Sequence, residues 1–317
     1  MGLLAGVQLG PPFGTWQRLS PQPLISPQGT EFESAGTFNP AVVEKDGKIA
    51  MLYRAQDKKG TSRLGYAESE DGIHFHRLAK PVFGPEAPYE NGGGTEDPRI
   101  VLVQGTYYLT YTGYNNVDGV GPGKRDAQLC LATSTDLIHW VRHGVIMPAY
   151  RSASNGGWTK SGAILSEKVN GKYWMYYFGD ASDTAGQMCV ASSKDLLHWT
   201  EAFDHPVISP RPKQFDSRLT EPGPPPVMTS DGILLVYNGA DDHLVYSTGW
   251  VLFDKTDPTK VIARADEPLL LPSTTWEKIG QVPNVIFVEG LVRRGKRWLF
   301  YYGGADKQIG AAGADSL

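Results

Sequence analysis

The chain has 317 residues, with 30 Lys and Arg against 34 Asp and Glu, which gives a formal net charge of -4. Hydrophobic residues make up 40% and charged residues 20% of the sequence, as in a globular protein, and no apolar run approaches the roughly 20 residues of a membrane span. Without a stripe of Lys and Arg, neither nucleic acid nor a membrane is expected as a partner, and a small or neutral ligand is favoured.

The N-terminal stretch from Met1 to Gly10 has apolar residues but neither a basic segment nor a signal cleavage pattern. We therefore expect a cytoplasmic protein, or the mature part of a periplasmic or secreted one. The two cysteines, Cys130 and Cys189, each lie inside an apolar run and are expected to be buried thiols. Their isolation fits neither a zinc site nor a redox pair, so no metal and no cofactor is expected.

Short strands and tight turns are predicted along the chain, because 37 Gly, 23 Pro and 11% aromatic residues favour them over helices. Five similar apolar runs follow turn-like stretches such as Asp46-Gly47 and predict five β-hairpins. In chain order, the runs are Ile49–Arg54, Tyr107–Thr112, Tyr173–Phe178, Ile233–Asn238 and Trp298–Gly303.

Three of the hairpins are followed by a common pattern, A-x-S-x-D-x-x-H-[WF], at Ala67–Phe75, Ala132–Trp140 and Ala191–Trp199. The aspartates of this pattern are 65 and 59 residues apart. A strand-only repeat of this size predicts an all-β protein, a five-bladed β-propeller forming one domain over 1–317, with roughly the first 15 residues as an extension. Because the A-x-S-x-D-x-x-H-[WF] pattern recurs in several blades, we expect it to be structural. Its Asp and His are expected to close a turn, and its aromatic ring to pack between sheets.

In a propeller, polar residues near the start of each inner strand are expected at the mouth of the central channel. Carboxylates beside Pro or Gly can also form turns. Glu221, however, lies in a proline-rich stretch and Glu289 follows an apolar run, so for these two a role in the site is favoured over a role in a turn. A ring of carboxylates with many Tyr and Trp indicates sugar chemistry, since aromatic faces stack on a pyranose and carboxylates bind hydroxyls or act as acid and base. The candidates are Asn39, Arg54, Glu96, Asp97, Arg99, Lys160, Asp180, Glu221, Asn238, Glu289, Tyr302 and Asp306.

Six ordered motifs support this interpretation: Phe38–Pro40, Leu52–Ala55, Glu96–Arg99, Lys160–Ala163, Glu221–Pro225 and Tyr301–Asp306. Together they resemble glycoside hydrolase family 130, and the resemblance extends over nearly the whole chain. It implies a five-bladed β-propeller that is either a β-mannoside phosphorylase or a β-1,2-mannosidase, with a β-mannoside oligosaccharide as its partner. It does not predict the oligomeric state.

The resemblance also bears on the attacking nucleophile. Phosphorylases of the family bind phosphate with an Arg and with a His-Arg pair, and the corresponding positions here read Gln128 and Tyr177-Phe178. Lys160 remains, and Lys124 or Arg125 could supply a cation from the preceding loop. Because a phosphate dianion needs such cations, the resemblance favours water and an exo-acting, inverting β-1,2-mannosidase.

On this resemblance Glu221 is one catalytic carboxylate and Asp180 stands in the place of the other, where a Glu is expected. Asp97, the acid of the phosphorylases, is expected to orient the sugar with Asn39, Arg54 and Arg99, in a ring of hydroxyl ligands that includes Glu289 and Asp306. Three alternatives stay open: a β-mannoside phosphorylase, a mannoside-binding propeller without activity, and a furanosidase of the related five-bladed families.

Overall fold

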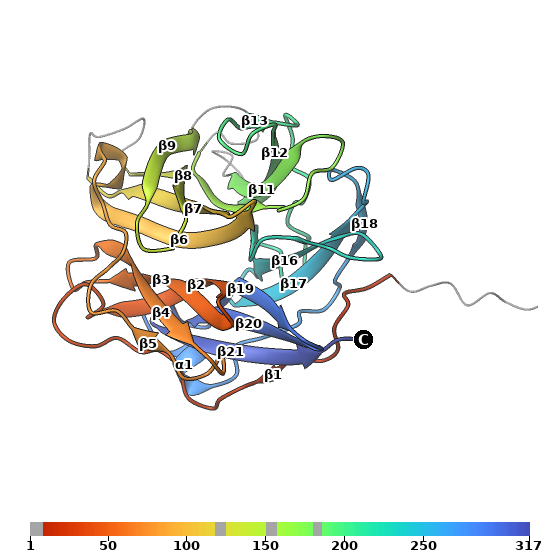
Figure 1. Ribbon diagram of the computed structural model, residues 1–317. Coiled ribbons are helices and arrows are strands. Elements are labelled where there is room, and N and C mark those ends of the chain that lie inside the picture. Colours follow the sequence, from red (N-terminus) through yellow and green to blue (C-terminus); the bar gives the residue numbers. More distant parts are fainter. Residues whose placement is uncertain (1–8, 118–124, 150–156, 180–185) are drawn as a thin grey trace, which may run out of the picture.

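The computed structural model describes residues 9–117, 125–149, 157–179 and 186–317. Within these ranges the chain consists of β-strands, one α-helical turn, α1 (Thr275–Lys278), and one 3-10 turn, η1 (Pro88–Glu90). The predicted all-β fold is therefore confirmed (Figure 1).

Hydrogen bonding arranges the strands in four sheets, none of which closes on itself in the described ranges. The largest sheet contains β2 (Gly36–Lys45), β3 (Lys48–Gln56), β4 (Ser62–Ser69), β5 (His76–Arg77), β6 (Gly92–Val103), β7 (Thr106–Asn115), β8 (Asp126–Ser134) and β9 (Val141–Met147). It has two antiparallel halves, β2–β5 and β6–β9, which are joined by the parallel pairing of Ser62 with Gly94. The four sheets thus contain five antiparallel strand groups.

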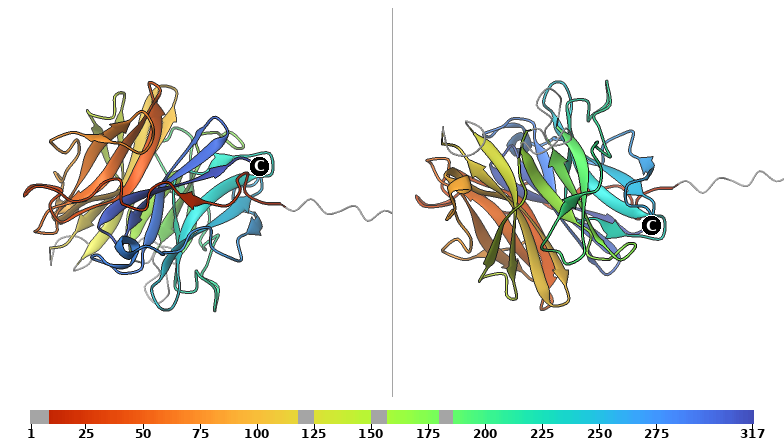
Figure 2. Two further views of the ribbon diagram at one scale, coloured as in Figure 1. Left: turned by 90° about the horizontal axis from the view of Figure 1, so that it is seen from below. Right: turned by 90° about the horizontal axis from the view of Figure 1, so that it is seen from above.

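The other three sheets follow in sequence order. They comprise β10 (Thr159–Ile164), β11 (Tyr173–Gly179), β12 (Gln187–Ser193) and β13 (Thr200–Glu201); then β14 (Leu219–Pro222), β15 (Val227–Met228), β16 (Ile233–Ala240), β17 (Tyr246–Phe253) and β18 (Val261–Arg264); and finally β19 (Ile286–Arg294), β20 (Arg297–Gly304) and β21 (Gln308–Asp315). β1 (Gln17–Arg18) completes the last sheet, because Gln17 pairs with Gly313 of β21. The N-terminal segment therefore runs along the C-terminal strands (Figure 2).

All five predicted apolar runs lie in strands, namely β3, β7, β11, β16 and β20. Each is antiparallel to the first strand of its group. The central parts of these strands are mostly apolar and lie buried on both faces. On β3, for example, Ile49 and Met51 pack toward β20 and β21, whereas Ala50 and Leu52 pack toward β7.

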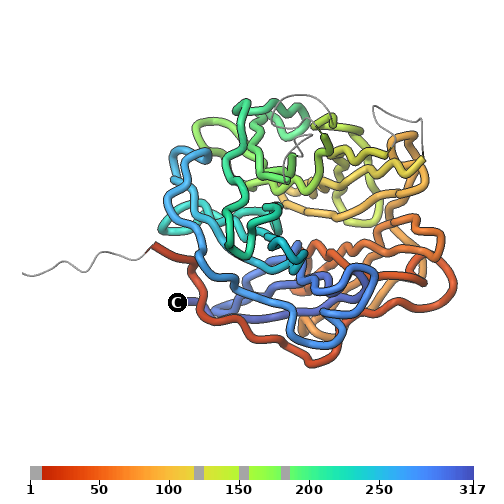
Figure 3. The backbone as a smooth tube through the Cα atoms, turned by 180° about the vertical axis from the view of Figure 1, so that it is seen from behind, coloured from red at the N-terminus to blue at the C-terminus, as the bar shows by residue number. Residues whose placement is uncertain are grey.

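The hydrophobic core is divided into five clusters, each between two consecutive strand groups. The fifth cluster joins the last group, β19–β21, to the first, β2–β5. Packing between groups is thus continuous around the described part of the molecule, and Figure 3 shows the same order of groups from behind. Cys130 and Cys189 lie buried in two different clusters without a disulfide, as predicted.

The repeated Asp-x-x-His pattern closes a turn after the third strand of three groups. In the first, Asp71 accepts hydrogen bonds from the backbone N–H groups of Ile73 and His74, both at 2.8 Å, and contacts His74 Nδ1 at 2.7 Å. The same contacts recur at Asp136 and Asp195. The prediction that this pattern is structural is confirmed.

Candidate active site

The first strands of four groups carry a β-bulge at corresponding places. The register of β2, β6, β10 and β19 shifts around Asn39, Asp97, Ser161 and Glu289, respectively. Three of these residues have a left-handed backbone, with φ of 48° at Asn39, 50° at Asp97 and 59° at Ser161. Because a bulge redirects a side chain out of the regular alternation, it can turn a polar group of a buried strand toward the centre of the molecule.

A cavity of about 480 Å³ lies where these strands meet. Seven of the residues predicted from the sequence line it: Asn39, Arg54, Glu96, Asp97, Lys160, Glu221 and Asp306. They come from all five strand groups and their adjoining loops. The structure therefore brings together most of the predicted polar site.

Asp97 lies in a network of hydrogen bonds with its neighbours. It accepts a bond from Asn39 Nδ2 at 2.9 Å and from Arg54 Nη1 at 3.1 Å. The other arm of Arg54, Nη2, pairs with Glu96 at 2.5 Å, and its Nε donates to Ser62 Oγ at 3.0 Å. Arg54 thus separates two adjacent carboxyl groups and fixes both.

Glu221 is held by two residues of β10. Lys160 Nζ lies 3.0 Å from Glu221 Oε1, and the Ser161 hydroxyl donates to the same oxygen. Although burial disfavours the ammonium, Glu221 and Asp97 raise the pKa of Lys160 above its ordinary value. Glu221 itself is 1% exposed, so it is a buried carboxylate with fixed donors at the cavity wall.

The carboxyl groups of the cavity differ in protonation. Burial opposes ionisation of Asp97, but Arg54 and Lys160 outweigh it and lower the pKa of Asp97. Burial raises the pKa of Glu96 despite the neighbouring Arg54. Burial likewise raises the pKa of Asp306 to about 6. Of Asp97, Glu96 and Asp306, Asp97 therefore ionises most readily, and Glu96 and Asp306 take up protons at higher pH.

Two buried polar atoms at the cavity have no hydrogen-bond partner within the described ranges: Asn39 Oδ1 and Thr112 Oγ1. Asn39 is 5% and Thr112 1% exposed. Buried polar atoms are normally paired, so these two are unusual features of the cavity wall. Thr112 was not predicted from the sequence, although it ends the predicted strand Tyr107–Thr112 and lies opposite Glu96 in the ladder.

The lining of the cavity also includes aromatic side chains. The rings of Tyr114 and Trp158 lie 5.7 Å apart, and the lining also includes Phe178, Tyr246 and Phe287. Such faces suit the C–H side of a sugar ring. The sequence predicted aromatic participation in general, but it did not identify these side chains.

Four predicted sugar contacts do not line the cavity. Arg99 and Glu289 are buried at 1% and 0% exposure and form an ion pair at 3.1 Å. Asn238 bonds to the backbone of Val288, and Tyr302 donates to Glu277 at 2.9 Å in the core.

Asp180, the predicted second catalytic carboxylate, lies outside the described residues, as does Lys124. Arg125, the other loop cation, is exposed, and its carbonyl accepts a hydrogen bond from Trp158 Nε1 at 3.2 Å.

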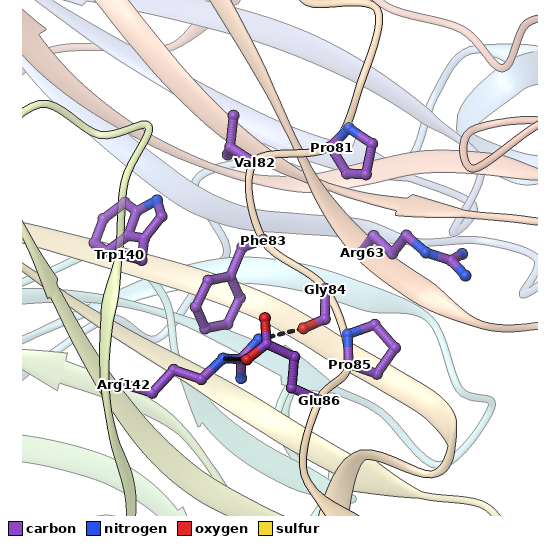
Figure 4. A pocket seen from close by; sticks show the side chains of 9 residues that line it. All are labelled: Arg63, Pro81, Val82, Phe83, Gly84, Pro85, Glu86, Trp140 and Arg142. Carbon is purple, nitrogen blue, oxygen red and sulfur yellow. Dashed lines mark hydrogen bonds and ion pairs between the residues drawn. The ribbon is translucent and has the colours of Figure 1, made fainter.

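A second cavity, of about 600 Å³, is lined by β4, β9 and the segment after β5 (Figure 4). Its Arg142 guanidinium stacks on Phe83 at 3.9 Å, donates to the Gly84 carbonyl and pairs with Glu86 at 3.2 Å. Glu86 is the one carboxylate among the described lining residues. Hydrolysis of a glycoside uses two carboxylates, so this cavity is not the candidate active site.

Neither a metal site nor a membrane span is found in the described ranges. Their His, Cys, Asp and Glu side chains form no group of three or more that could hold a metal ion. No helix there is long and apolar enough to cross a membrane.

Carboxylates, paired cations and aromatic rings around one cavity of an all-β fold define a carbohydrate-active protein. The family model described as β-1,4-mannooligosaccharide phosphorylase matches residues 21–316. The chain belongs to glycoside hydrolase family 130.

Two phosphorylases and one solved structure illustrate what the chain is similar to. A 1,2-β-oligomannan phosphorylase of Thermoanaerobacter sp. (strain X514) is 41% identical over 93% of this chain and 96% of its own length. A β-1,2-mannobiose phosphorylase of the same organism is 37% identical over 93% of this chain and 95% of its own length. A solved structure from work on glycoside hydrolases of the family that target β-1,2 mannosidic linkages in Candida mannan is 38% identical, with a TM-score of 0.84, and covers 95% of this chain and 94% of its own.

Proposed function

We propose that the chain is an exo-acting β-1,2-mannosidase that hydrolyses β-mannosides with inversion. The β-1,2 linkage is supported by the names of the similar relatives, which act on 1,2-β-oligomannan and β-1,2-mannobiose. The choice of water as nucleophile rests on the charges of the cavity.

The observation that carries this proposal is that both cations among the described cavity residues are already paired. Arg54 contacts Glu96 and Asp97, and Lys160 contacts Glu221. A phosphate dianion would have to compete with these carboxylates for its charge partners, whereas water needs no cation. Phe178, at a position where the phosphorylase pattern has a cation, lines the cavity with its ring 4.8 Å from Lys160 Nζ.

In this proposal Glu221 is the general base. The donors from Lys160 and Ser161 suit an ionised carboxylate, the form that can take a proton from water. The family resemblance makes Asp180 the other catalytic carboxylate, so in this proposal it is the acid. Asp97, Asn39, Arg54 and Asp306 bind the hydroxyls of the mannosyl residue that is transferred.

We further propose that the fold is a single five-bladed β-propeller, in which the two halves of the largest sheet are separate blades. The five clusters between consecutive groups and the pairing of β1 with β21 support this arrangement. In such a ring, a site to which every blade contributes residues is expected at the centre.

Products formed with and without phosphate test the nucleophile. With β-1,2-mannobiose we expect mannose as the sole product, released first as the α-anomer, at a rate that does not depend on inorganic phosphate. Proton NMR during the first turnovers reports the anomer, and chromatography reports the products. Formation of mannose 1-phosphate in the phosphate-containing reaction would overturn the hydrolase assignment.

Phosphorolysis is the second candidate. It is favoured by the two Thermoanaerobacter phosphorylases, which match this chain at 41% and 37% identity. In that case the paired Lys160 would have to release Glu221 when phosphate binds, and turnover in water alone would be absent.

The Tyr114–Trp158 pair is expected to bind the sugars beyond the scissile bond. We predict that Trp158→Ala raises KM for a β-1,2-mannotriose about tenfold with little change in kcat, since an aromatic contact contributes about 0.5–1.5 kcal/mol. Trp140→Ala is the matched control, because Trp140 lines the second cavity and its Nε1 is likewise bonded to a carbonyl. An equal rise in KM for both variants would contradict a role of Trp158 in binding.

A further inference from the structure

Arg99 ends the Glu96-Asp-Pro-Arg motif, but its side chain points away from the cavity into the core between β6 and β14. Nε donates to the carbonyl of Gly223 at 2.8 Å, and Nη2 donates to the carbonyl of Pro222 at 2.7 Å. These two residues directly follow Glu221. Arg99 therefore fixes the backbone that carries the candidate base.

The same guanidinium holds the bulge of β6. Its Nη1 donates to the carbonyl of Asp97 at 3.1 Å. A guanidinium is planar, with its donors in fixed directions, so bonds to carbonyls on two strands set the distance between those strands. Arg99 thus links the backbone at Asp97 to the backbone next to Glu221.

Glu289 is the carboxyl partner of Arg99. Burial raises the pKa of Glu289 well above its ordinary value, although Arg99 favours the ionised form. Its carboxyl is fully buried and lies 3.1 Å from Arg99 Nη2. Neither of its oxygens has a hydrogen-bond partner in the described ranges, so the ion pair is what orients it. Asn238 fixes the residue before it, because its side chain donates to the Val288 carbonyl and accepts from the Val288 N–H, both at 2.9 Å.

The packing around this network leaves little room for adjustment. A Cβ on Gly223 would lie 2.7 Å from the carbonyl oxygen of Val236 and 2.8 Å from that of Val288. Contacts this short show that β14 already lies against the backbones of β16 and β19. A change in Arg99 is therefore transmitted to Glu221 and is not absorbed by empty space.

We propose that Arg99 and Glu289 are positioning residues, which hold Asp97 and Glu221 at the separation that the reaction needs without touching the sugar. The inference rests on the proposed function, since it takes Asp97 and Glu221 as the groups around the substrate. The sequence predicted that Arg99, Glu289 and Asn238 contact the sugar. In the present proposal they act on catalysis only by holding the backbone that carries the site residues.

Kinetics of Arg99→Lys and Glu289→Gln test the proposal. Lys keeps the charge but has one nitrogen in place of the three that reach Gly223, Asp97 and Pro222, so it cannot link both strands with the same geometry. Gln keeps the shape of Glu289 but replaces its carboxyl group with a neutral amide. For β-1,2-mannobiose we expect kcat to fall about 10²-fold in each variant while KM stays within about threefold, because misplacement of reacting groups by about 1 Å has effects of this size. A tenfold or larger rise in KM with unchanged kcat would instead identify a sugar contact and overturn the proposal.

Asp216→Asn is the matched control. Asp216 is fully buried and pairs with Arg211 at 3.0 Å and Arg264 at 2.6 Å, but it does not line the cavity. We expect this variant to lower the melting temperature and to leave kcat unchanged at a temperature where it is folded. If kcat falls equally in Asp216→Asn, the effect is general destabilisation and the proposal fails.

A crystal structure of Glu289→Gln provides a readout that is independent of turnover. The proposal expects Pro222 and Gly223 to shift and the bond from Ser161 to Glu221 to be lost or lengthened. An unmoved β14 together with wild-type kcat would overturn it, even if Arg99→Lys does not fold. If the wild-type protein itself turns over no mannoside, with or without phosphate, then the proposed function fails, and the displacement of Glu221 in the crystal still decides the positioning role.

Discussion

Replacing Glu221 by Gln is expected to lower kcat on β-1,2-mannobiose by about 10²- to 10⁴-fold, the usual contribution of a general base. Gln has nearly the same size and can still accept a hydrogen bond from Ser161, but it cannot take a proton from water. The dissociation constant for mannose, measured by calorimetry, is expected to change little, because Asp97, Asn39 and Arg54 are untouched. The loss is therefore expected in kcat and not in binding.

Glu277→Gln is the control for the Glu221 variant. Glu277 is a buried carboxylate that pairs with an arginine, Arg18, at 2.7 Å, and it lies in the core away from the cavity. Its substitution is expected to lower stability while kcat is retained. Azide added to Glu221→Ala is expected to restore turnover, because the anion fits the space of the missing carboxylate and attacks the anomeric carbon in place of water. The glycosidic bond breaks as this bond forms, so the products are α-mannosyl azide and the protonated departing sugar. If the wild-type protein binds mannosides but does not turn them over, the proposed enzyme activity is wrong, and the chain is a mannoside-binding propeller.

Asp97→Asn is expected to lower kcat/KM about 10- to 100-fold, mainly through KM. A hydrogen bond to a charged group contributes about 1.5–3 kcal/mol. Asn39 and Arg54 both donate to Oδ1 of Asp97, so Asn can keep these two bonds, but it loses the negative charge and its Nδ2 cannot accept a hydrogen bond from a sugar hydroxyl. Asn is close in size to Asp, so the cavity keeps its shape. Initial rates over a range of β-1,2-mannobiose concentrations separate KM from kcat.

The leaving group discriminates between the two roles of Asp97. An aryl β-mannoside that releases a strongly acidic phenol needs no proton donor. If Asp97 orients the sugar, Asp97→Asn is impaired on this substrate as much as on mannobiose. Recovery of activity on the aryl substrate alone would make Asp97 the acid, as the family resemblance implies for the phosphorylases.

The strand pattern of this fold could be predicted because each hairpin contains its own signal. Apolar runs after Gly-containing turns are local features, and all five runs lie in strands. The continuous packing between the last and first groups could not be derived from any one segment. This packing depends on the way neighbouring side chains of a strand point to opposite faces. On β20, for example, Tyr301 and Tyr302 face two different clusters.

The same alternation explains which of the predicted residues line the cavity. Asn39 and Asp97 reach the cavity because a bulge lies at each, and a bulge changes the facing of every residue around it. Arg99 follows the bulge of β6 and turns to the core, while Tyr302 faces Glu277. Residue type and spacing identified the polar segments correctly, but the direction of each side chain depends on backbone geometry that those patterns do not encode.

The left-handed backbone at Asn39, Asp97 and Ser161 implies a trade-off between activity and thermal stability at these three positions. Non-glycine residues in this conformation cost about 1–3 kcal/mol each, whereas the whole fold of a typical protein is stable by only about 5–15 kcal/mol. Glycine would relieve the backbone at each bulge, but it would delete the polar group that the bulge presents. Substitutions that raise stability are therefore expected in the hydrophobic clusters between the sheets, with these three residues left unchanged.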